Sequence, residues 1–181
     1  MNRVIEDRIV VRVAGAEDAG FAEAASVLIA DAALEFDVAK RSPRLLREKI
    51  VGGQAVLALE DDELVGFAFW STWQNGRFVS HSGLVVRPDR RGRALGRRLK
   101  WELTAASRRR HPDAALMSLT SSRAVRAMNR ALGFVQVPLD HLTLDPAFWR
   151  GCEACRNHAE LGAHPDHCRC VGMILRPDRD A

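Results

Sequence analysis

The spacing of hydrophobic residues in the first third of the chain predicts one strand followed by two helices. A run of β-branched residues at 8–13 is typical of a strand. From Glu17 to about Phe36, apolar residues recur at spacings of three and four, which indicates one face of a helix. Ser42-Pro43 predicts the start of a second helix, and Gly52-Gly53 predicts its end.

The middle of the chain predicts three consecutive antiparallel strands. Apolar runs occupy residues 55–60, 64–73 and 77–86. An acidic turn at 61–63 separates the first two runs, and Asn75-Gly76 separates the second from the third. Turn residues between apolar runs are the usual signal of hairpins, so the three runs should pair in order.

After Pro88 the pattern alternates between helix and strand. We expect helices over 95–110 and about 122–132, and strands over 114–120, 134–137 and 171–175. Up to residue 137 the order is strand, helix, helix, three strands, helix, strand, helix and strand. This mixed order predicts an α/β or α+β fold with one central sheet flanked by helices.

Length and composition indicate a single globular domain over residues 1–181. The chain has 47% hydrophobic and 28% charged residues, which is typical of folded rather than disordered proteins. No apolar run approaches the roughly 18 residues that would span a bilayer. The first ten residues include two acids and lack a separate apolar core, so we expect no secretory signal and a cytoplasmic location.

The net charge is ordinary, but nearly all of the basic residues are arginine rather than lysine. The net charge is only +4, which does not by itself imply a nucleic-acid partner. Lys40, Lys49 and Lys100 are the lysines, and all other basic residues are arginine. Arginine suits phosphate or carboxylate binding, although a GC-rich genome produces the same bias. The chain contains no tyrosine.

A turn rich in small residues joins the third central strand to the next helix. Within residues 84–103, Gly92, Ala94 and Gly96 stand where the strand ends and the helix begins. Small residues let the backbone approach an anion, and the helix N-terminus adds positive potential. An ordinary strand-to-helix turn with a solvated basic face is the alternative interpretation of this pattern.

This turn resembles motif A of the GNAT superfamily of N-acetyltransferases, which binds the pyrophosphate of acetyl-coenzyme A. The matching residues are Arg91-Gly92-Arg93-Ala94-Leu95-Gly96, and Val86-Arg87-Pro88 precedes them. Ala94 stands in place of one glycine of the family pattern. The resemblance covers about residues 8–137 and implies a mostly antiparallel sheet. It also implies that the backbone of Leu84, Val85 and Val86 holds the pantetheine arm and that the amides of 92–97 hold the diphosphate. The cofactor-binding residues implied for the turn are Arg91, Gly92, Arg93, Ala94, Leu95, Gly96 and Arg97.

A second segment, residues 121–134, resembles motif B of the same family. Leu132-Gly133-Phe134 matches the family's ending, and Ser122 stands where relatives often have an asparagine near the cofactor. Asn129 stands where relatives often have a tyrosine that acts as general acid toward the coenzyme A thiolate. An amide hydrogen-bonds sulfur but cannot protonate it, so Asn129 is either a ligand of the sulfur or a helix-surface residue.

The general base is predicted less directly. Relatives often carry a carboxylate on the strand before motif A, but here that strand offers His81 as its titratable group and Ser82 as a proton relay through water. Strand alternation predicts His81, Gly83 and Val85 on one face. A hydrogen-bonded structural histidine is the alternative, and Glu35 and Asp37 are further candidates.

The resemblance implies an acetyl-CoA-dependent N-acetyltransferase that transfers acetyl directly to a primary amine in a ternary complex. Two other functions remain open. One is a catalytically idle acyl-CoA sensor with the same fold, and the other is a zinc-containing nucleic-acid binder built on the arginine-rich helix from Arg97 to Arg110 and the cysteine-rich tail. The acceptor, a small molecule or a protein amine, is not readable from the sequence. Neither is the choice between monomer and homodimer.

The four cysteines are concentrated in a Cys/His-rich excursion over residues 148–170. They form a C-x-x-C pair and a C-x-C pair, and such pairs suit a tetrahedral, structural Zn²⁺ site. His164 or His167 could replace one thiolate, and free thiols, a redox pair or a local disulfide are the alternatives. The predicted zinc ligands are Cys152, Cys155, Cys168 and Cys170.

Overall fold

A seven-stranded mixed sheet forms the centre of the molecule. The computed structural model describes residues 9–161 and 168–177. The strands follow one another across the sheet in the order β1-β2-β3-β4-β5-β7-β6. Their bounds are β1 Ile9–Val13, β2 Ala55–Glu60, β3 Glu63–Trp73, β4 Phe78–Val86, β5 Ala115–Thr120, β6 Val135–Val137 and β7 Val171–Leu175.

Neighbouring strands of this sheet are antiparallel with one exception. Strands β4 and β5 are parallel, and they pair only from Phe78 to His81 on β4 and from Ala115 to Ser118 on β5. The predicted mixed, mostly antiparallel sheet is therefore confirmed. The predicted strand at 171–175 enters the sheet between β5 and β6.

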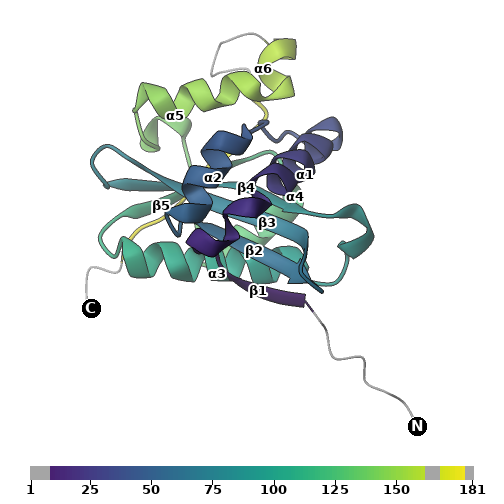
Figure 1. The fold of residues 1–181 in the computed structure, drawn as a ribbon. Coiled ribbons are helices and arrows are strands. Elements are labelled where there is room, and N and C mark those ends of the chain that lie inside the picture. Colours follow the sequence, from purple (N-terminus) through teal and green to yellow (C-terminus); the bar gives the residue numbers. More distant parts are fainter. Residues whose placement is uncertain (1–8, 162–167, 178–181) are drawn as a thin grey trace.

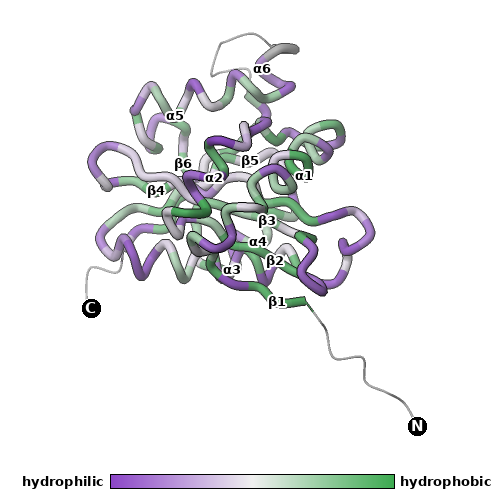
Figure 2. The backbone as a smooth tube through the Cα atoms, in the orientation of Figure 1, coloured by the Kyte–Doolittle hydropathy of each residue, from purple (hydrophilic) through white to green (hydrophobic). Residues whose placement is uncertain are grey.

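Helices cover both faces of the sheet (Figure 1). Helix α3 packs on one face over a core that includes Leu99, Leu103 and Trp70. Helices α1 and α2 pack on the other face, over Phe67 and Phe69. The hydrophobic segments run through the sheet and the polar ones through many of the loops (Figure 2). The helix bounds are α1 Ala22–Glu35, α2 Pro43–Val51, α3 Leu95–Arg110, α4 Arg123–Ala131, α5 Pro146–Arg150 and α6 Arg156–Leu161.

Side-chain caps explain where several helices begin. Ser42 accepts a hydrogen bond from the amide of Leu45 at 3.3 Å, and Pro43 occupies the first turn of α2. Ser122 caps α4 in the same way. The helix predicted from residue 17 differs in its first turn, which is a 3₁₀ helix, η1, over Ala16–Phe21. None of the helices in the described residues is long and apolar enough to cross a membrane.

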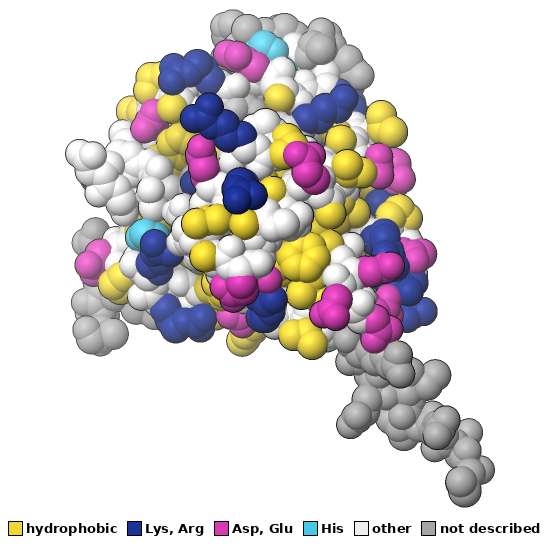
Figure 3. Space-filling model, viewed as in Figure 1, with side chains coloured by type: hydrophobic (Ala, Val, Ile, Leu, Met, Phe, Trp, Pro, Cys, Tyr) yellow, Lys and Arg dark blue, Asp and Glu magenta, His cyan; other side chains and the backbone are white. Residues whose placement is uncertain are grey.

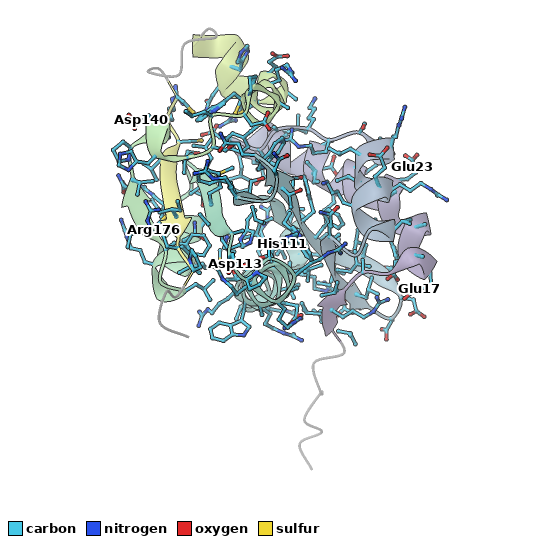
Figure 4. The ribbon with its side chains drawn as sticks, turned by 90° about the vertical axis from the view of Figure 1, so that its left-hand side faces the viewer. Glu17, Glu23, His111, Asp113, Asp140 and Arg176 are labelled. Carbon is cyan, nitrogen blue, oxygen red and sulfur yellow. The ribbon has the colours of Figure 1, made fainter. Side chains whose placement is uncertain are left out.

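The segment after β6 folds back over the body of the molecule. It contains α5, the 3₁₀ helix η4 (Gly151–Ala154) and α6, and it lies beside α1 and α2 (Figure 1). Arg41 donates to the carbonyl of Gly151, and Arg156 pairs with Asp37. In the view of Figure 4, Glu17 and Glu23 mark the side of η1 and α1, while Asp140 and Arg176 mark the opposite end, near β6 and β7.

Candidate functional site

The parallel pair of strands opens into a cleft. Beyond His81 and Ser118, strands β4 and β5 no longer pair, although each continues. The backbone edge of β4 that faces β5 is therefore unpaired from Ser82 onward and is available to a ligand. The cavity between the strands is lined on one side by residues 82–86 and on the other by residues 119–122.

A β-bulge at Gly83 produces this divergence. Val85 pairs with Phe67 but Ser82 pairs with Phe69, so β4 carries an extra residue relative to β3. Gly83 has a φ of +62°, and a Cβ there would lie 2.8 Å from Cε1 of Phe69. Only glycine suits this combination of backbone conformation and close approach.

Because of this bulge, the side chains of β4 do not alternate as predicted. His81 points toward α3, whereas Val85 packs into the core beneath α1 and α2. The two side chains therefore lie on opposite faces of the sheet, and the prediction that they share a face was wrong. Strict alternation fails because the extra residue at the bulge reverses the direction of every later side chain.

The cavity has a volume of about 1130 Å³ and collects most of the predicted site. It extends from the split strands to the loop after α1 and to the segment 146–158. Gly92, Arg93, Ala94, Leu95, Arg97 and Asn129 are not among its lining residues. The predicted residues that line it are His81, Ser82, Leu84, Val85, Val86, Arg91, Gly96, Ser122, Cys152, Cys155, Cys168 and Cys170.

The glycine-rich turn presents the N-terminus of α3 to this cavity. Gly92 and Ala94 both have positive φ, +79° and +58°, so the alanine adopts the left-handed conformation that the replaced glycine would favour. The N-cap residue Ala94 provides no side-chain cap to α3. The first N–H groups of a helix lack partners four residues earlier and can bind an anion. Among them, the amide of Arg97 donates to the carbonyl of Ala94 at 3.0 Å.

Arg91 is fixed at the mouth of the cavity. Its Nε donates to the carbonyl of Val86 at 3.1 Å, and its Nη1 pairs with Glu35 at 2.9 Å. Its guanidinium also lies 5.0 Å from the centroid of the Phe36 ring. These contacts link the glycine-rich turn to the end of α1 and orient a cation beside the turn.

His81 lies at the closed end of the cleft, held from both sides. Its Nε2 lies 2.9 Å from Oγ of Ser107, and its Nδ1 lies 2.9 Å from Nζ of Lys100. Burial, together with the positive charges of Lys100 and Arg108, lowers the pKa of His81 well below its ordinary value. A histidine with a lowered pKa and two occupied nitrogens is a weak base, so the geometry favours the alternative of a structural histidine.

The two candidate carboxylates are also engaged. Glu35 pairs with Arg91, and Asp37 accepts hydrogen bonds from Oγ of Ser121 at 2.6 Å and Nε of Arg156 at 2.9 Å. Burial would raise the pKa of Asp37, but its hydrogen bonds outweigh burial and lower it. Asp37 therefore acts as a tether between three segments of the cavity wall.

Of the two residues predicted from motif B, Ser122 lies at the cavity and Asn129 does not. Ser122 lines the cavity while its hydroxyl caps α4 at the amide of Val125. Asn129 is fully buried away from the cavity and donates to the sulfur of Met173 at 3.4 Å. Its placement therefore offers no support for a role at a coenzyme A thiolate.

Lys100 is the site residue that sequence reasoning missed. It is 1% exposed, lines the cavity and projects from α3 one turn beyond Gly96. Its signal is in the sequence: it lies beside the apolar stripe formed by Leu95, Leu99 and Leu103, and it is one of three lysines in an arginine-rich chain. Helical spacing alone does not say that a lysine beside such a stripe is buried.

Aromatic side chains from β3 and α5 line another part of the cavity. Trp73 and Phe148 meet edge to face with ring centroids 5.5 Å apart, and Trp149 packs against Phe148 at 5.0 Å. Phe148 and Trp149 come from α5, so the C-terminal segment supplies a wall of the cavity.

The four cysteines gather along the same C-terminal wall as free thiols. Burial and the neighbouring thiols Cys168 and Cys155 raise the pKa of Cys152 to about 11. Within residues 9–161 and 168–177, no group of three or more histidine, cysteine or acidic side chains is arranged to hold a metal ion. The zinc prediction therefore gains no support, and His164 and His167 lie outside the described residues.

Several arginines of α3 serve the fold rather than a free basic surface. Arg98, Arg108 and Arg110 donate to the carbonyls of Ile9, Ala114 and Gly52 respectively. On the face shown in Figure 3, basic and acidic side chains are intermixed. These observations do not favour the nucleic-acid interpretation, which needs a concentrated positive surface.

Several solved structures are similar to this fold. One is N-acetylglutamate synthase from Neisseria gonorrhoeae, complexed with coenzyme A and N-acetyl-glutamate. It aligns with a TM-score of 0.68 and 19% identity over 96% of this chain. This chain spans only 36% of the length of that protein. Rv2747 from Mycobacterium tuberculosis, in complex with CoA, aligns with a TM-score of 0.66 and 16% identity over 92% of this chain and 98% of its own.

A third similar structure is diaminobutyrate acetyltransferase EctA from Paenibacillus lautus, in complex with L-2,4-diaminobutyric acid and coenzyme A. Its TM-score is 0.65 and its identity is 15%, with 96% of this chain and 98% of that chain covered. No match is found among curated proteins. The family model described as "Acetyltransferase (GNAT) family" matches residues 27–134.

Proposed function

The chain belongs to the acetyltransferase (GNAT) family, whose model matches more than half of its residues, and from that premise we propose that it transfers acetyl from acetyl-CoA to a primary amine. The observation that carries the proposal is the cleft between β4 and β5, which leads to the uncapped N-terminus of α3. A cleft of this kind suits an extended ligand with an anionic diphosphate at one end.

We assign the pantetheine arm to the free edge of β4 at Leu84, Val85 and Val86, and the diphosphate to the amides of residues 92–97. Arg91, Arg93, Arg97 and Ser122 would complete the cofactor site. Backbone amides near Val85 would polarise the thioester carbonyl, because such donors stabilise the charge that develops on the oxygen. The similar structures that hold coenzyme A support this assignment at the level of the fold.

We place the acceptor amine in the aromatic part of the cavity, around Trp73 and Phe148. A volume of about 1130 Å³ has room for both substrates together, which favours direct transfer in a ternary complex. The description of EctA names L-2,4-diaminobutyric acid as its substrate, and the synthase structure holds N-acetyl-glutamate, so a small amine is the first class to test. The cytoplasm remains the proposed location, since the described cysteines are free thiols and a reducing compartment keeps them so.

Thiol release from acetyl-CoA, measured against a panel of amino acids, polyamines and aminoglycosides, tests the proposal. We expect turnover with at least one amine, and initial-velocity lines that intersect when both substrates are varied. Parallel lines would replace direct transfer with an acetyl-enzyme intermediate. Tight binding of coenzyme A by calorimetry, without turnover of any amine, would favour the sensor instead.

A further inference from the structure

A lysine buried in the cavity floor needs an explanation that the fold does not supply. Lysine is almost never fully buried unless it is paired with an acid. Lys100 is 1% exposed, and none of the ion pairs found among the described residues includes it. Its Nζ lies beside His81 at the closed end of the cleft, where β4 and β5 begin to part.

The hydrogen bonds around His81 define which groups can exchange a proton. The hydroxyl of Ser107 donates to the carbonyl of Thr104 at 3.2 Å, so its oxygen is left to accept from Nε2 of His81. The imidazole is then neutral with its proton on Nε2, and its Nδ1 accepts from Nζ of Lys100. His81 has no free lone pair for a substrate, whereas Lys100 has further N–H groups.

The surroundings of Lys100 keep its ammonium weakly stabilised. The groups that face it are the neutral ring of His81 from β4 and the ring of Phe134, whose centroid lies 4.8 Å from Nζ. The charge of Arg108 acts on His81. Burial lowers the pKa of Lys100 to about 7, so the group changes protonation state near neutral pH.

We propose that Lys100 is the general acid that protonates the sulfur of coenzyme A as it leaves. The proposal rests on the acetyltransferase function above. It places the sulfur at the closed end of the cleft, because the diphosphate is assigned to the turn before α3 and the arm to the edge of β4. The chain has no tyrosine to supply a phenol proton, and Asn129 is buried elsewhere.

The proton balance of the step is simple. The amine nitrogen attacks the thioester carbon and forms the C–N bond, and the nitrogen loses its extra proton to water. The C–S bond then breaks, its electron pair goes to sulfur, and the sulfur takes a proton from the Lys100 ammonium. Neutral Lys100 recovers a proton from water before the next turnover. His81 is a positioning residue in this scheme, since it orients the lysine through Nδ1.

The test compares Lys100→Met with Lys49→Met, which removes a half-buried lysine of α2 outside the cavity. For Lys100→Met we expect coenzyme A to bind about tenfold more weakly, because a hydrogen bond to its sulfur is lost. We also expect a kcat lower by about 100-fold, the usual size of general acid catalysis. The wild type and Lys49→Met should show a kcat that falls above neutral pH, and Lys100→Met should lose this fall. A kcat within threefold of wild type, or an unchanged pH profile, overturns the proposal while leaving the acetyltransferase function intact.

A binding measurement keeps the proposal testable if no amine is turned over. A hydrogen bond from Lys100 to sulfur should make coenzyme A bind more tightly than desulfo-coenzyme A, by about tenfold for a charged donor. This preference should disappear in Lys100→Met and persist in Lys49→Met. A preference that survives the loss of Lys100, or none in the wild type, shows that the lysine does not contact the sulfur. In the absence of turnover, a Lys100-dependent preference supports the contact while the proposed function itself fails.

Discussion

At the scale of single residues, Ala94 carries a conformational cost in the glycine-rich turn before α3. Its φ of +58° is left-handed, which costs an L-residue about 1 kcal/mol that glycine avoids. We therefore expect Ala94→Gly to raise the free energy of unfolding by about 0.5–1 kcal/mol, measured by thermal denaturation, without weakening the binding of coenzyme A. Ala127→Gly, on the exposed side of α4, is the control and should be destabilising by a similar amount. Destabilisation by both substitutions would show that the turn is not strained.

Lys100 predicts a pH dependence of stability that is separate from its catalytic role. Its pKa is about 7 in the folded protein against an ordinary 10.5, so the folded state releases the proton first. Stability should therefore increase from pH 7 to pH 10, by about 3–5 kcal/mol if the full difference is realised. Urea unfolding at several pH values should show this rise in the wild type and in the exposed-site control Lys40→Met, but not in Lys100→Met. Equal slopes in all three proteins would contradict the burial of a lysine with a lowered pKa.

Residue chemistry was only partly predictable from the sequence. The glycine-rich turn is a local feature, so its small residues could be identified directly. His81 was recognised as titratable, but its partners Lys100 and Ser107 come from a distant helix and are joined to it only by the packing of α3. Asn129 was expected either to contact the sulfur or to lie on the surface of its helix. Helical spacing alone did not reveal that its side chain is buried in the fold.

At the scale of elements, the bulge in β4 controls the width of the cleft. Gly83→Ala adds a Cβ 2.8 Å from the Phe69 ring at a left-handed position, and we expect a loss of about 2–4 kcal/mol of stability with at least tenfold weaker binding of coenzyme A. Gly76→Ala is the matched control: its φ is +84°, but nothing lies within 4 Å of the added Cβ. It should cost about 1 kcal/mol and leave binding unchanged. If the two substitutions affect binding equally, the bulge does not set the cleft.

The strands and long helices were readable from the sequence because their periodicity is local. Helix α3 and strand β7 begin and end where the pattern predicts. The bulge was not readable, since one extra residue in β4 leaves no mark in its hydrophobic pattern. The 3₁₀ turn at Ala16–Phe21 was absorbed into the predicted first helix for a related reason: both helix types repeat apolar residues at similar spacing.

At the scale of the whole molecule, Asp37 joins the cavity wall to the C-terminal segment. We expect Asp37→Asn to lower stability by about 1–2 kcal/mol at pH 7, because it removes the charge that pairs with Arg156, and to raise KM for the acceptor more than KM for acetyl-CoA. Its pKa is lowered in the folded protein, so its contribution is present above about pH 4 and is lost as the pH falls through the lowered value. Acid unfolding curves of the variant should therefore be flatter in this range. The exposed Asp31→Asn should behave as wild type, and a variant curve that coincides with both would remove Asp37 as a tether.

The position of β7 has a consequence for the order in which the molecule assembles. Strands β2, β3 and β4 each pair with the next strand along the chain, whereas β1 pairs with β2 across η1, α1 and α2. In the described sheet β5 and β6 are joined through β7, which follows α5 and α6. Contacts between near neighbours form quickly, whereas those that close long loops form slowly. Strands β2 to β4 can therefore form as an early folding unit while residues 171–175 are still unplaced. The edge of β4 that we assign to coenzyme A belongs to this early unit, and the wall that α5 builds beside the proposed acceptor site belongs to the late part. Under the proposed function, folding thus forms the groove for coenzyme A before it encloses the space for the amine.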